Sequence, residues 1–127
     1  MVYKVNGYLP QQGDLVWINF DPSIGKEIKK RRPALVLSTK QYNGTTGMIA
    51  ICPITSTKRF GFVEIDEDQK VKGCVNPLQL YTFDFINKLR QVEYIEPLND
   101  EDMAAVIQTV ENIFKFWKLK DYANGET

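Results

Sequence analysis

The chain has 127 residues, of which 43% are apolar and 25% charged, and its 16 basic side chains balance its 16 acidic ones. This length suits one domain, and the composition excludes a disordered or collagen-like chain. The longest apolar run, residues 48–54, is far shorter than the roughly 20 residues that span a bilayer. The N-terminal residues also lack the apolar stretch of a secretory signal. We therefore expect a single domain over residues 1–127, in the cytoplasm and without a membrane partner.

The first three quarters of the chain have the β-branched and aromatic runs, bounded by turn formers, that are typical of short strands. Strands are predicted, in chain order, over residues 13–21, 33–38, 48–55, 60–65, 74–81 and 92–95. A polar loop reaching Arg32 separates the first two. Asn43-Gly44 is a strong signal for a two-residue hairpin turn, so we expect it to join the second and third strands.

After Pro97 the apolar residues recur at steps of three and four, which predicts an amphipathic helix. Asn99 is the expected N-cap, and acidic residues follow it where the helix dipole favours them. The expected apolar stripe comprises Met103, Val106, Ile107, Val110, Ile113, Phe114 and Trp117. We expect this stripe to cover the strands, with part of it available to a partner, and residues 121–127 to form a frayed tail.

Several short strands followed by one long helix predict an α+β fold. We expect a small, strongly bent antiparallel barrel with the helix packed on it. Trp17 and Trp117 are expected in its core.

The predicted hairpin also fixes a register. With Asn43-Gly44 at the turn, Arg32 lies directly opposite Thr55, with Cβ atoms about 4.5 to 5.5 Å apart. Pro33 favours an extended backbone at Arg32. The sequence therefore predicts a guanidinium beside a hydroxyl, although a slip of one residue would move Thr55 to the other face.

Charge is unevenly distributed along the chain. Eight basic residues and one acidic residue lie between Lys26 and Arg59, whereas five basic and nine acidic residues lie between Gly73 and the C-terminus. This separation favours a positive face that suits a polyanion such as nucleic acid. A solvated lysine-rich loop is the alternative.

The sequence contains no histidine. It therefore lacks the commonest metal ligand and the side chain best suited to proton transfer near neutral pH. Zinc proteases and histidine-dependent nucleases are excluded, and we expect no metal ion or other cofactor. Cys52 and Cys74 belong to no metal-binding or redox motif, so reduced core thiols are expected rather than a disulfide scaffold.

Several short motifs follow one another in the first half of the chain. They are Gly13-Asp-Leu-Val-Trp17, Asp21-Pro-Ser-Ile-Gly-Lys-Glu27, Arg32-Pro-Ala-Leu-Val-Leu-Ser38, Tyr42-Asn43, Thr46-Gly47 and Cys52-Pro-Ile-Thr55. Their identity, order and spacing resemble the MazF/PemK family of toxin endoribonucleases.

This resemblance implies an SH3-like barrel of the CcdB/PemK type that forms a homodimer. It also implies sequence-specific, metal-independent cleavage of single-stranded RNA, mRNA above all, which would inhibit translation and growth. A small cognate antitoxin of the MazE/PemI type is implied as a partner. Operator DNA is then contacted only through the toxin–antitoxin complex.

The resemblance also assigns roles to particular residues. Arg32, Thr55 and Glu27 fall on the family's catalytic positions, and Gln79 falls on a position that contacts RNA. Further candidates for RNA binding are Lys26, Arg31, Ser56 and Lys58.

Two departures from the family pattern concern surfaces that would contact bases. Residues 28–31 are Ile-Lys-Lys-Arg, where relatives often have glutamine and small residues, and Leu78 replaces a frequent acidic residue. The recognised RNA sequence is therefore not transferable. Phe60 and Phe62, beside two basic residues, are candidates for stacking on bases.

Two other functions remain open. A toxin on the same barrel could bind DNA gyrase without chemistry, but the tail Asn124-Gly-Glu-Thr127 lacks the Trp-Gly-Ile that gyrase-directed relatives share. The third possibility is a noncatalytic SH3-like module that binds RNA or peptides.

Overall fold

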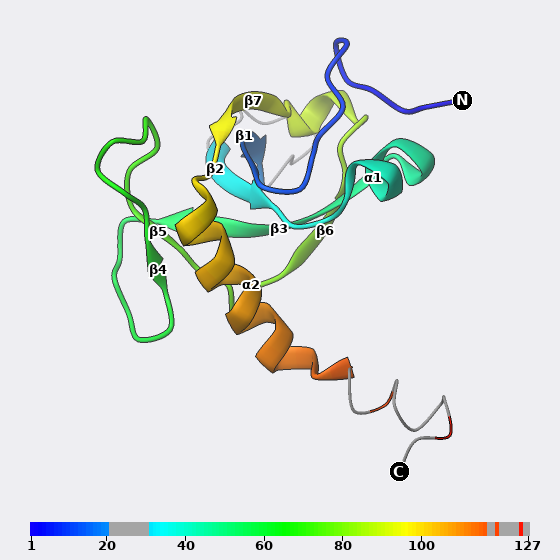
Figure 1. The fold of residues 1–127 in the computed structure, drawn as a ribbon. Helices are drawn as coiled ribbons and strands as arrows, with labels where there is room; N and C mark the ends of the chain where they lie inside the picture. The colour runs from blue at the N-terminus through cyan, green and yellow to red at the C-terminus, as the bar shows by residue number, and fades with distance from the viewer. Residues whose placement is uncertain (21–30, 117–118, 120–124, 126–127) are drawn as a thin grey trace.

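A computed structural model describes residues 1–20, 31–116, 119 and 125. Within these residues, seven antiparallel strands form a sheet that curls into half a barrel, and the helix α2 follows the last strand (Figure 1). The elements are β1 (Asp14–Asn19), β2 (Arg31–Val36), α1 (Lys40–Thr46), β3 (Met48–Thr55), β4 (Val63–Glu64), β5 (Cys74–Val75), β6 (Tyr81–Asp84), the 3-10 helix η1 (Lys88–Arg90), β7 (Glu93–Pro97) and α2 (Asp100–Phe114). The predicted α+β class is confirmed.

The long strand β3 organises the sheet, whose order is β4-β5-β3-β2-β1-β7 with β6 also on β3. One edge of β3 pairs with β2. Its other edge pairs with β6 over Met48–Ile51 and with β5 at Ile54 and Thr55. Because β3 has partners along both edges, the positions of its residues are fixed from two sides.

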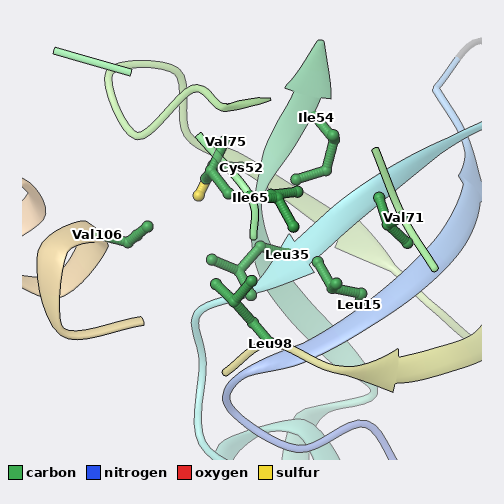
Figure 2. Close-up of a cluster of buried hydrophobic side chains, with 9 residues drawn as sticks. All are labelled: Leu15, Leu35, Cys52, Ile54, Ile65, Val71, Val75, Leu98 and Val106. Carbon is green, nitrogen blue, oxygen red and sulfur yellow. The ribbon is translucent and has the colours of Figure 1, made fainter. Parts of the chain in front are cut away.

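The central part of the sheet, formed by β1, β3 and the second half of β2, is buried on both faces, and alternate residues of each strand point to opposite sides. Leu15, Leu35 and Cys52 belong to one core cluster, which Val106 of α2 completes (Figure 2). Their chain neighbours Val16 and Ala34 belong to the second cluster, with Phe85. Two clusters around one sheet account for the apolar character of β1 to β3.

The prediction of a hairpin turn at Asn43-Gly44 is wrong, because both residues lie buried in the helix α1. Thr39 caps this helix by accepting from the N–H of Tyr42, and Gly47 ends it in the left-handed conformation. The side-chain amide of Asn43 donates to the carbonyl of Pro10 at 2.8 Å. Contacts with the N-terminal segment therefore outweigh the local turn preference.

The N-terminal segment contains the Asn-Gly turn that the structure does form. Asn6 and Gly7 have φ values of 50° and 78°. Val5 and Tyr8 exchange two backbone hydrogen bonds around them. Positive φ at both central residues is the geometry that Asn-Gly favours in a two-residue hairpin.

Two predicted strands are longer than the observed ones. The prediction over residues 60–65 is reduced to β4, and the prediction over residues 74–81 is divided between β5 and the start of β6. The interruption follows from Asn76-Pro77, since proline has no N–H to donate. A turn forms there instead, with the N–H of Leu78 bonded to the Asn76 side chain.

The predicted start of α2 is confirmed, since the Asn99 side chain accepts from the N–H of Asp102 at 2.8 Å. The predicted burial of its stripe holds only in part. Val106 is buried and Met103 and Val110 are partly buried, but Ile113 and Phe114 are 44% and 45% exposed. Figure 1 shows the reason, because the C-terminal half of α2 extends away from the strands.

The end of the helix also differs from the expectation. The helix ends at Phe114, where Lys115 adopts a φ of 50°. Trp117 lies outside the described residues, as does the tail 121–127 apart from Gly125.

Other expectations about the core have mixed outcomes. Trp17 is 38% exposed, so its predicted place in the core is wrong. Cys52 and Cys74 are buried and free, as predicted, and burial raises the pKa of the Cys52 thiol to about 12. None of the described helices is long and apolar enough to cross a bilayer.

The buried Asn43 amide gives a test of the α1 arrangement. We expect Asn43→Ala to lower the free energy of unfolding by about 1 to 3 kcal/mol, because it leaves the Pro10 carbonyl without this donor. Urea denaturation measures the change. Gln41→Ala, at an exposed position of the same helix, is the control and is expected to change stability by less than about 0.5 kcal/mol. Equal effects would contradict this role for Asn43.

Candidate active site

A cleft of about 540 Å³ lies beside the C-terminal end of β3. The residues that line it come from β2, from β3 and the turn after it, and from the turn between β5 and β6. They are Arg32, Pro53, Ile54, Thr55, Thr57, Arg59, Phe60, Phe62, Asn76, Leu78 and Gln79. Among the described residues, this lining contains two guanidinium groups and no carboxylate, so this part of the cleft is electropositive.

Arg32 and Thr55 both line this cleft. The observed pairs between β2 and β3 are Ala34 with Pro53, Leu35 with Cys52 and Val36 with Ile51. Continuing this register by two residues brings Arg32 level with Thr55, as the sequence predicted. The predicted register is therefore correct although the predicted turn is wrong.

Thr55 is held by the turn that follows β3 and by β5. Its hydroxyl oxygen accepts from the N–H of Thr57 at 3.1 Å, which leaves the hydroxyl proton to be donated elsewhere. Thr55 also pairs with Cys74 of β5. Beside Cys74, Gly73 has a φ of +119°, and a Cβ there would lie 2.5 Å from the Thr55 carbonyl oxygen. Only glycine allows this close approach.

Two turns form the outer wall of the cleft. The first spans residues 59–62, where the N–H of Phe62 donates to the Arg59 carbonyl at 3.1 Å. The second spans residues 76–79 and is held by the side chain of Asn76. Arg59 and Asn76 thus join the cleft, although the sequence did not single them out as site residues.

Of three further site residues predicted from the sequence, Gln79 lies in the cleft, whereas Ser56 and Lys58 are not among its lining residues. Gln79 lines the cleft, and its Oε1 accepts from the Asn76 amide at 3.1 Å. Ser56 is exposed directly after β3. Lys58 is exposed and forms an ion pair with Glu64 at 2.8 Å, and the hydrogen bond and charge of that carboxylate raise the pKa of Lys58 above its usual value.

Arg31 is separated from Arg32 because adjacent strand residues point to opposite faces. It forms an ion pair with Glu93 and lies over the Trp17 ring, with Cζ 5.7 Å from the ring centroid. Arg31 lines a different hollow, of about 780 Å³. The structure does not bring it together with the cleft. Lys26 and Glu27 lie outside the described residues.

Arg90 holds the end of β1, a role that the sequence did not indicate. Its guanidinium donates to the carbonyls of Asn19 and Phe20 and lies 3.9 Å from the centroid of the Phe83 ring. Asn19 in turn donates to the carbonyl of Leu89. These contacts join residues far apart in the chain, so they have no local sequence signal. They fix the point where the chain leaves β1 for the segment that contains Glu27.

The cleft can bind an anion and donate hydrogen bonds to it. A guanidinium binds phosphate oxygens with two parallel hydrogen bonds and keeps its charge at any physiological pH. Thr55 adds a hydroxyl donor next to Arg32. Among the described residues, no three acidic, cysteine or histidine side chains are grouped to hold a metal ion.

Comparison with protein families matches residues 11–114 to the PemK-like, MazF-like toxin of type II toxin-antitoxin systems. Over 70 residues, the chain is 46% identical to the endoribonuclease toxin MazF of Escherichia coli strain K12. This match covers 54% of the chain and 63% of the E. coli protein, which is less than two thirds of that protein's length.

Solved structures from Deinococcus radiodurans are similar over most of the chain. Its MazF is 34% identical with a TM-score of 0.73, covering 85% of this chain and 98% of that one. A chain of the MazE-MazF crystal structure is 31% identical with a TM-score of 0.72, covering 85% and 97%.

The close approach of Gly73 to Thr55 can be tested by Gly73→Ala. We expect it to shift the backbone around Thr55, seen as changed amide NMR shifts at residues 54–56, and to destabilise the fold. Gly13→Ala is the matched control, because Gly13 also has a positive φ, of +95°, but has no atom within 4 Å of the new Cβ. Both variants are expected to carry backbone strain of about 1 to 3 kcal/mol. A Gly73→Ala variant no less stable than Gly13→Ala, with unchanged shifts at residues 54–56, would contradict the contact.

Proposed function

Because the chain belongs to the PemK-like, MazF-like family of toxins of type II toxin-antitoxin systems, we propose that it is an endoribonuclease that cuts single-stranded RNA. The observation that carries this proposal is the cleft in which Arg32 and Thr55 lie together. The relatives named as endoribonucleases agree with it.

The proposed reaction uses the nucleophile that RNA itself carries. The 2′ oxygen attacks the neighbouring phosphorus, a new bond forms between them, and the bond from phosphorus to the 5′ oxygen breaks. The reaction needs removal of the 2′ proton, stabilisation of charge on the phosphorane, and a proton for the leaving 5′ oxygen. The products are a 2′,3′-cyclic phosphate and a 5′ hydroxyl. No step requires a metal ion.

Arg32 is the proposed phosphate-binding residue. It lies at the start of β2, paired with Ile18 of β1, so its backbone is held in the sheet while its side chain is exposed to the cleft. Its guanidinium would bind two phosphate oxygens as negative charge develops on them. A preorganised donor of this kind typically contributes about 3 to 4 kcal/mol to lowering the barrier.

Thr55 is the proposed second donor. Because its oxygen already accepts from the N–H of Thr57, its own proton points to a different acceptor. In the proposed complex that acceptor is a phosphorane oxygen. Gly73 is then a positioning residue, since its close packing sets where Thr55 stands.

Glu27 is the remaining proposed catalytic residue. A carboxylate oxygen can accept a proton, whereas a guanidinium is already protonated and has no acceptor. We therefore assign removal of the 2′ proton to Glu27 rather than to Arg32. The contacts of Arg90 hold the carbonyls of Asn19 and Phe20, the last described residues before Glu27 in the chain.

The proposed partners follow from the family. They are a MazE/PemI-like antitoxin, as in the D. radiodurans MazE-MazF structure, and a second copy of this chain. Operator DNA would be contacted only through the antitoxin complex. With mRNA as the substrate, the proposed place of action is the cytoplasm.

Incubation of the purified protein with a mixed RNA pool in EDTA tests this function. We expect fragmentation by the wild-type protein, and Arg32→Ala and Thr55→Ala are each expected to slow it by about 100- to 1000-fold. Lys40→Ala and Thr45→Ala remove a positive charge and a hydroxyl from exposed positions in α1 and are expected to cut normally. No fragmentation by the wild-type protein would favour a gyrase-binding toxin or a noncatalytic module.

The substrate gives an independent test of the chemistry. A single 2′-deoxy nucleotide on the 5′ side of the cleaved bond is expected to abolish cutting there, because it removes the nucleophile, while leaving binding in place. Gel analysis of an end-labelled oligonucleotide measures both. Continued cleavage at the substituted position would refute attack by the 2′ oxygen.

A further inference from the structure

Phe60 is an apolar side chain that the fold leaves wholly in solvent, with a relative exposure of 102%. It occupies the second position of the turn at residues 59–62. The third position, Gly61, has a φ of +89°, which a glycine adopts without strain. This turn projects the Phe60 ring away from the protein core, at the rim of the cleft.

A second apolar side chain stands across from this turn. Leu78 is 54% exposed in the turn at residues 76–79. The two turns touch, because a Cβ built on Gly61 would lie 3.5 Å from Cδ1 of Leu78. Phe60 and Leu78 therefore belong to one exposed apolar surface on the cleft that also contains Arg32 and Thr55.

A polar group with a fixed orientation borders this surface. Gln79 accepts from the Asn76 amide through Oε1, so its Nε2 is directed to the other side of its own amide. The Asn76 carboxamide is held in turn, since its Oδ1 accepts from the N–H of Leu78. This arrangement presents a donor beside an apolar surface.

We propose that Phe60 and Leu78 bind one nucleobase of the RNA next to the phosphate at Arg32 and Thr55, beside Gln79, where the family resemblance already implies a contact with RNA. This inference rests on the proposed function and names the part of the cleft that recognises the substrate. Bases stack on aromatic rings beside cationic side chains, and Arg59 lies directly before Phe60. The absence of carboxylates from the described lining suits a polyanion rather than a basic peptide.

The test uses Phe60→Leu, which keeps an apolar side chain but removes the aromatic face, and Phe60→Trp, which keeps a flat ring. The substrate is an oligoribonucleotide that contains a site cut by the wild-type protein. Matched oligonucleotides carry one abasic residue at each position around that site. Because Phe60 is fully exposed, neither variant is expected to change the midpoint of urea denaturation. Tyr42→Leu removes an exposed ring from α1 and is the control, with cleavage expected at the wild-type rate.

We expect Phe60→Leu to lower kcat/KM by about 5- to 150-fold, the range for loss of one stacked base. Phe60→Trp is expected to cut faster than Phe60→Leu. One abasic position should lower kcat/KM by a similar factor in the wild-type protein and should have little further effect in Phe60→Leu, because the same contact is already lost.

Two results would overturn the inference while leaving the proposed function intact. The first is cleavage by Phe60→Leu at the wild-type rate. The second is that every abasic substitution lowers kcat/KM by the same factor in Phe60→Leu as in the wild-type protein. Failure of the wild-type protein to cut any RNA would overturn the proposed function itself.

Discussion

The antiparallel pairing of β2 with β3 is the interaction on which the cleft depends. Side chains alternate between faces along each strand, so a slip of one residue would turn Thr55 away from Arg32. The edge of β3 that faces away from β2 opposes this slip, since β5 pairs with Thr55 and Gly73 packs against its carbonyl oxygen. Backbone pairing and one close glycine contact, rather than a network of side chains, set the separation of the two functional groups.

The register was predicted from a hairpin turn that the chain does not form. It is nevertheless correct, because α1 takes the place of that turn between β2 and β3 and leaves Ala34 paired with Pro53. The turn depends on distant contacts. Asn43-Gly44 and Asn6-Gly7 are the same dipeptide, yet only the second forms a two-residue hairpin. Asn43 instead binds the Pro10 carbonyl from within a helix, a contact that no local pattern of residues reveals.

The same difference between local and distant contacts applies to the rest of the chain. The N-cap at Asn99 is a local interaction and was predictable, whereas burial of the α2 stripe depends on the direction in which the helix leaves the sheet. In the cleft, Arg32, Thr55 and Gln79 could be found by family resemblance, and the first two also by register. Gly73 could not, because its function is a contact with a residue distant in the sequence.

The cleft divides into two parts with different structural constraints. Thr55 lies in a paired strand next to the buried residues Ile54 and Cys74, so changes around it disturb the core. Phe60 and Leu78 lie on turns with exposed side chains, where substitutions alter no core contact and usually change stability little. Leu78 is also a position at which this chain departs from the family pattern. The fold thus allows the surface proposed to bind a base to vary while the proposed cleavage chemistry stays fixed, which would let related toxins differ in the RNA sequences they cut.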